Sequence, residues 1–91
     1  MKKNYLVTVR VEEFDYTEEA TGGNINTYYE VPVSATSKKD AEEKAKEEVM
    51  KRNREGWDRA RGIDHIPWIH SCQLVDTLEG IEYRILGDMF N

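Results

Sequence analysis

The junction between a strand pattern and a helix pattern decides the fold, and it reads VPVSATSKKDAEEKA over residues 31–45. Its first half completes an alternating run of inward-facing residues, as expected of a half-buried strand: Tyr29, Val31, Val33 and Ala35. Its second half predicts a helix, because Ser37 is a favourable N-cap and Asp40 approximates a capping box. The junction therefore predicts a strand followed directly by a helix that lies close to the sheet.

The predicted helix is charged, with a narrow stripe of small apolar residues: Ala41, Ala45 and Val49, with Met50 beside them. Opposite charges recur four residues apart with the acid first, which favours helix formation: Asp40–Lys44, Glu42–Lys46, Glu47–Lys51 and Glu48–Arg52. Gly56 is the expected end of the helix.

N-terminal to the junction, residues 4–11 alternate with their apolar set on one face: Tyr5, Val7, Val9 and Val11. The pair Gly22-Gly23 predicts a tight hairpin turn. This turn sets a register in which a β-bulge at Glu12-Glu13, opposite Pro32, brings Val11 against Val33. The alternative is a shorter hairpin with a disordered acidic loop over residues 15–26.

C-terminal to the helix, the patterns are shorter. The sequence predicts a helical turn from Trp57 to Arg61, a loop bracketed by Gly62 and Pro67, a strand over 68–75, a turn over 76–80 and a last strand over 81–86. The order is ββαββ. The expected fold is α+β, an antiparallel sheet of about four strands with one long helix packed on one face.

Length and composition exclude several classes of protein. A chain of 91 residues predicts a single domain, residues 1–91. The net charge of −5 disfavours direct nucleic-acid binding, which needs a basic surface. The single cysteine, Cys72, fits a reducing compartment, and no apolar run is long enough to span a membrane. We therefore expect a cytoplasmic protein.

Two arrangements of reactive residues suggest catalysis or metal binding, but neither is complete. His65, His70 and Cys72 invite a zinc site, but their spacing matches no familiar zinc motif, and a fourth ligand such as Asp64 is needed. His70 and Cys72 would share a strand face and form a nucleophile pair, but no oxyanion hole accompanies them. The expectation is no enzyme, no metal and no cofactor.

An acidic run interleaved with aromatic residues is the most informative functional signal. Lys and Arg are absent between Arg10 and Lys38, whereas five carboxylates fall within residues 12–19: Glu12, Glu13, Asp15, Glu18 and Glu19. Phe14, Tyr16 and Tyr28 are the expected aromatic anchors. The sequence predicts that these eight residues bind a protein partner with a basic surface.

The stretch over residues 31–45 resembles the strand–cap–helix junction of small phage and mobile-element proteins of the DpnD/PcfM-like kind. In size, acidity and lack of a catalytic motif, the chain is also similar to phage anti-CRISPR and anti-restriction inhibitors. This resemblance implies an inhibitor of a host defence nucleoprotein complex, acting in the host cytoplasm.

The resulting hypothesis is a non-enzymatic protein-binding module that blocks a basic surface with an acidic hairpin. One alternative is a structural or regulatory homodimer formed through sheet edges. Another is a small nucleic-acid binder that uses the basic end of the helix: Lys51, Arg52, Arg54, Arg59 and Arg61.

Overall fold

Two long antiparallel strands form the centre of the sheet, β1 (Lys3–Asp15) and β2 (Ile25–Ala35). The structure is a computed structural model that describes residues 1–15, 25–58 and 63–88. The inner-face residues predicted for both strands are confirmed as core, with 8% or less of each exposed: Tyr5, Val7, Val9, Val11, Tyr29, Val31, Val33 and Ala35.

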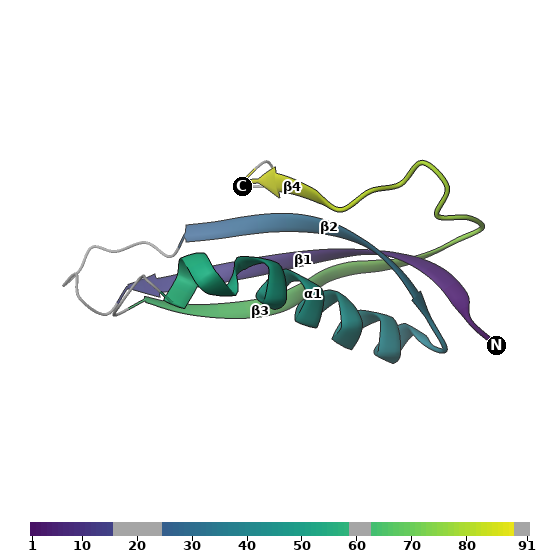
Figure 1. Cartoon of the computed structure of the whole chain (residues 1–91), viewed down its shortest axis with the longest axis horizontal. Coiled ribbons are helices and arrows are strands. Elements are labelled where there is room, and N and C mark those ends of the chain that lie inside the picture. Colours follow the sequence, from purple (N-terminus) through teal and green to yellow (C-terminus); the bar gives the residue numbers. More distant parts are fainter. Residues whose placement is uncertain (16–24, 59–62, 89–91) are drawn as a thin grey trace.

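Strand β3 (Ile63–Val75) pairs with β1, and the short β4 (Arg84–Gly87) pairs with β2. In the described residues the sheet has four antiparallel strands in the order β3-β1-β2-β4. Helix α1 (Lys38–Asp58) lies across one face of this sheet (Figure 1). The predicted α+β architecture is therefore confirmed.

Small residues let α1 lie close to the sheet. Ala41, Ala45 and Val49 are completely buried, as the stripe in the sequence predicts. At the start of the helix, Asp40 N donates to Ser37 Oγ over 3.1 Å, so Ser37 is the N-cap. The Asp40 carboxylate accepts from Thr36 N, also over 3.1 Å, which closes a capping arrangement one residue wider than the expected box.

The helix continues past its predicted end. Gly56 lies inside α1, and Trp57, predicted to start a separate helical turn, belongs to the same helix. Glycine costs a helix about 1 kcal/mol relative to alanine. Trp57 offsets that cost because its ring packs against the core and stacks on the His65 ring, with centroids 4.2 Å apart.

Two of the predicted ion pairs form on α1, Asp40–Lys44 at 3.3 Å and Glu48–Arg52 at 2.6 Å. Lys46 pairs with Glu43 at 3.2 Å instead of with Glu42. Residues three and four apart are both neighbours on a helix surface, so a flexible lysine can reach either acid.

The predicted register of the first hairpin is wrong. Val33 lies opposite Tyr5, not opposite Val11, and β1 pairs with β2 from Lys3↔Ala35 to Glu13↔Ile25 without interruption. No bulge occurs at Glu12-Glu13. The observed register brings the apolar sets of both strands onto the helix side, where they are buried. The glycine pair that suggested the wrong register lies outside the described residues.

Pro32 is accommodated by an edge and not by a bulge. On one side it lies opposite Leu6 of β1. On its other side, β4 pairs with β2 only at residues 28–30 in the described part of the chain. A residue without an N–H is tolerated where no strand needs its hydrogen bond.

The irregularity that does occur is in β3. Thr8 lies opposite Ser71 and Val9 lies opposite Ile69, so His70 is an extra residue in the ladder. The bulge changes the phase of β3, so Ile69 and Cys72 both pack against the core. The predicted strict alternation over 68–75, with His70 and Cys72 on a shared face, is therefore wrong.

Two further boundaries differ from prediction. Pro67 lies within β3, which begins at Ile63, so no loop extends to Pro67. The turn near Gly80 forms as expected: Ile81 N donates to Leu78 O over 3.0 Å, and Gly80 has φ +77°. The last strand begins at Arg84 and not at Ile81, and Ile85 within it is 65% exposed.

Candidate protein-interaction site

The beginning of the acidic run continues the sheet at one end of the molecule. Glu12 and Glu13 lie in β1, between β2 on one side and β3 on the other. The pairing with β3 extends to Asp15↔Ile63, so this part of the hairpin is not a free two-stranded arm. Tyr16, Glu18 and Glu19 lie outside the described residues.

Glu12 lies on the sheet face opposite α1, where it is held by an indole. Trp68 Nε1 donates to Glu12 Oε1 over 3.1 Å. The guanidinium of Arg10 lies 5.6 Å from the centre of the Trp68 ring, and Arg10 Nη1 donates to Asn26 Oδ1 over 2.9 Å. Trp68 is still 47% exposed. The face therefore presents a half-exposed aromatic ring beside a positioned carboxylate.

Glu13 faces the helix side of the sheet. Its Oε1 lies 3.7 Å from Nε2 of His65, the residue opposite it on β3. The His65 side chain is 7% exposed and stacks on Trp57 with an interplanar angle of 11°. This cluster joins the end of α1 to β1 and β3, so it orders the acidic end of the sheet.

The expected aromatic anchors differ in accessibility. Phe14 is half-buried on the face opposite α1. Tyr28 is buried, and its ring meets His70 edge-on at 5.2 Å between centroids. Since a buried ring cannot insert into a partner without moving, Tyr28 supports the site from within. Trp68 is the exposed anchor that the sequence analysis missed, and its position directly opposite Arg10 became visible only with the β3 register.

The pKa values of two tyrosines, Tyr29 and Tyr83, are raised. Burial, with the neighbouring Tyr83 and Glu13 charges, raises the pKa of Tyr29 to about 12. Burial also raises the pKa of Tyr83, whose ring lies under the Arg52 guanidinium at 4.0 Å. Both phenols therefore stay neutral near pH 7 and act as packing groups.

The chemistry open to His70 and Cys72 is limited by their separation. Cys72 packs on the helix side, whereas His70 contacts Tyr28 on the other face. Burial, aided by the charge of Glu42, raises the pKa of the Cys72 thiol, which lowers its thiolate fraction. Among residues 1–15, 25–58 and 63–88, no group of three or more His, Cys, Asp and Glu could hold a metal ion.

The basic end of α1 is only partly neutralised. Arg52 is held by Glu48 and by the Tyr83 ring. Lys51 and Arg54 make no ion pair in the part of the chain that the structure describes. Arg59 and Arg61 lie outside that part.

Comparisons with protein-family models, with curated proteins and with solved structures find no match to this chain. Within the described ranges, no helix combines the length and the apolar character needed to cross a bilayer.

Proposed function

We propose that this chain is a non-enzymatic protein-binding module that presents its acidic end to a basic surface of a partner. We define the acidic end as residues 12–19 together with Trp68. In this proposal the partner is a host nucleoprotein complex and the chain is a phage-encoded inhibitor, as its resemblance to such inhibitors implies.

The observation that carries the proposal is the contact between Trp68 and Glu12. Interface hot spots combine a rigid aromatic side chain with positioned polar groups, and the half-exposed indole beside the held carboxylate has this form. Further carboxylates follow Glu12 directly in the sequence, which adds long-range attraction for a basic partner.

The test is affinity capture from lysate of the encoding organism. The variant replaces every acid of the run by its amide: Glu12→Gln, Glu13→Gln, Asp15→Asn, Glu18→Gln and Glu19→Gln. A matched control removes the same charge from exposed positions elsewhere: Glu55→Gln, Asp76→Asn, Glu79→Gln, Glu82→Gln and Asp88→Asn.

We expect the first variant to lose the captured partner and the control to keep it. Raising the salt concentration should weaken capture by the parent chain, because interactions between exposed charges are screened. Equal capture by the two variants would contradict the proposal, as would loss of capture in the control alone.

A homodimer through sheet edges is the second candidate function. It is favoured by the two edge strands: β3 pairs with β1 alone, and β4 pairs with only residues 28–30 of β2, within the described residues. Such edges invite strand pairing. Sedimentation velocity separates the candidates, since a tight dimer at low concentration favours this second function over the first.

A further inference from the structure

A groove runs between α1 and the edge strand β3, on the helix side of the sheet, whereas Glu12 and Trp68 lie on the opposite face. One end of the groove adjoins Glu13, whose Oε1 lies 3.7 Å from Nε2 of His65. The larger hollow of the groove has a volume of about 610 Å³ and is lined by Glu43, Lys46, Glu47, Met50, Lys51, Arg54 and Pro67. A smaller hollow of about 200 Å³ is lined by Met50, Arg54, Trp57, Ile63 and His65. Because Met50 and Arg54 line both, we treat the two hollows as one α1/β3 groove.

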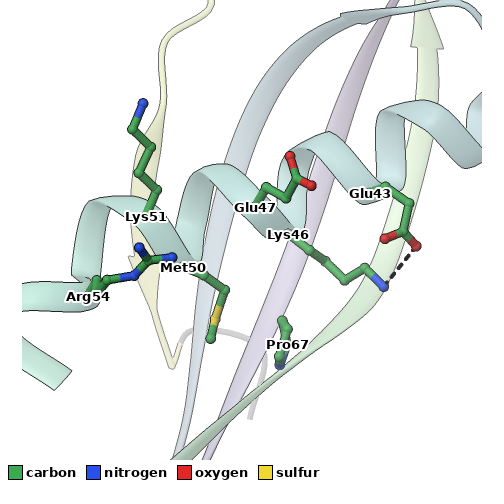
Figure 2. Close-up of a pocket in the computed structure, with 7 residues that line it drawn as sticks. All are labelled: Glu43, Lys46, Glu47, Met50, Lys51, Arg54 and Pro67. Carbon is green, nitrogen blue, oxygen red and sulfur yellow. Dashed lines mark ion pairs between the residues drawn. The ribbon is translucent and has the colours of Figure 1, made fainter. Parts of the chain in front are cut away.

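The floor of the groove is apolar and adaptable. Figure 2 shows Met50 extending from α1 on the side where Pro67 of β3 lies, with Arg54 one turn further along the helix. Methionine is unbranched and adjusts its shape to different apolar partners. In the smaller hollow, Trp57 is fixed by its stack on His65, which gives that part a rigid aromatic wall.

The charge in the groove is positive where the two hollows meet. Lys46 is already held by Glu43 at 3.2 Å, and Glu47 lies on the same flank. Arg54 makes no ion pair among the described residues, and the described residues that line the smaller hollow include no carboxylate. A guanidinium with free donors beside an apolar floor is suited to bind a carboxylate.

We propose that the α1/β3 groove binds an acidic, extended segment of a partner protein. One carboxylate of that segment pairs with Arg54, and a neighbouring apolar side chain packs on Met50 and Pro67. The occupant is a peptide and not a nucleic acid, because a peptide can place one carboxylate at Arg54 and uncharged residues beside Glu43 and Glu47, whereas a nucleic acid carries a phosphate at every position. The chain then carries two binding surfaces: the acidic end for a basic partner surface, and the α1/β3 groove for an acidic segment.

The experiment uses a short, capped, fluorescein-labelled peptide of alternating leucine and glutamate, titrated against the full chain. A peptide of leucine and glutamine and a short single-stranded oligothymidine are the comparison probes. The key variant is Arg54→Gln. Its control, Lys39→Gln, removes the same charge from an exposed position at the other end of α1.

We expect Arg54→Gln to weaken binding of the acidic peptide by about tenfold or more, the effect of losing one charge-assisted hydrogen-bonded contact. Lys39→Gln should bind within about twofold of the parent, as expected for a distant exposed charge. In a heteronuclear NMR spectrum the acidic peptide should shift the indole N–H signal of Trp57 and leave that of Trp68 in place.

Three results would overturn the proposal: equal affinity in the two variants, equal affinity for the glutamine peptide, or tighter binding of the oligothymidine. Self-association that Arg54→Gln abolishes would assign the groove to a second copy of this chain and would also overturn it. The acidic-end variant of the previous subsection serves as an independent check. It should bind the acidic peptide at least as well as the parent, whatever its effect on partner capture.

Discussion

The ionisation of Tyr29 is coupled to folding. Tyr29 is buried on β2, its ring lies 6.2 Å from that of Tyr83, and its pKa rises to about 12. An unfolded tyrosine ionises near pH 10. A raised pKa stabilises the folded state fully below pH ~10, and that stabilisation is lost as the pH rises towards 12.

We predict that Tyr29→Phe reduces the loss of stability between about pH 10 and 12, because phenylalanine cannot ionise. The measurement is the free energy of unfolding by urea at several alkaline pH values, together with ultraviolet titration of the phenols. Tyr5→Phe is the control, since Tyr5 is equally buried. If the two variants follow the same pH dependence, the coupling assigned to Tyr29 is wrong.

The carboxyl group of Asp40 makes the stability of the start of α1 depend on pH. Its pKa is lowered by the hydrogen bond from Thr36 N, with further help from Lys44. A carboxyl with a lowered pKa stabilises the fold above its unfolded pKa, about 3.9. That contribution is lost as the pH falls through the folded value.

Asp40→Asn should therefore destabilise the chain more at pH 6 than at about pH 2, where the parent carboxyl is protonated as well. Thermal unfolding followed by circular dichroism across this range provides the measurement. Glu47→Gln, an exposed change on the same helix, is expected to show no such trend. A difference between parent and Asp40→Asn that is constant with pH would rule out the capping role.

Single residues were predicted unequally well. The inward valines of β1 and the alanines of α1 follow the two elementary periods, so local sequence was enough to place them. The contacts of Trp68 with Glu12 and of His65 with Glu13 join residues more than fifty positions apart. Such contacts depend on the register between distant strands, which no local pattern contains.

Between elements, the distance from α1 to the sheet is set by side-chain volume. Ala45 lies in the middle of the buried stripe and has no exposed surface. We predict that Ala45→Leu costs about 1–3 kcal/mol, because the added methyl groups overpack this contact. Glu47→Leu, on an exposed part of the same helix, should stay within about 0.5 kcal/mol of the parent.

Chemical denaturation of both variants tests this expectation. A cost for Ala45→Leu no greater than that of the exposed control would mean that the helix can move away from the sheet freely. The slope of the unfolding transition should be similar in both variants if they keep the same fold.

Elements were easier to predict than their junctions. The capped start of α1 is a local signal and appears as expected, whereas its end depends on Trp57 reaching His65 across the structure. The hairpin register was inferred from a glycine pair and not from the fit of apolar faces. The observed register aligns the four-residue apolar set of β1 with the apolar set of β2, and both sets are buried.

At the scale of the whole molecule, the chain is elongated. Its Cα radius of gyration is 14.3 Å and its extents are 48 × 24 × 22 Å. A compact domain of this length has a radius of gyration of about 12 Å. The radius of gyration exceeds this value because the long strands and the long helix extend along the same axis of the molecule (Figure 1).

We predict a small-angle scattering radius of gyration of about 14–16 Å for the dilute protein, the upper part of this range allowing for hydration. A monomer has this value at all concentrations measured. A radius that grows with concentration, with a matching increase in forward scattering, would instead support pairing through the edges of β3 or β4.

The bulge at His70 determines what an in-frame deletion in β3 would do to the fold. It separates two parts of β3 with different alternation. Before the bulge the odd-numbered residues face the helix, and after it the even-numbered Cys72 does. An in-frame loss of that one codon would remove the unpaired residue and make Ile69 and Ser71 neighbours opposite Val9 and Thr8, so Ile69 would still face the core and Trp68 would still face outward. A gene for this protein thus has at least one site within a strand where losing a triplet leaves the facing of the other residues of that strand unchanged.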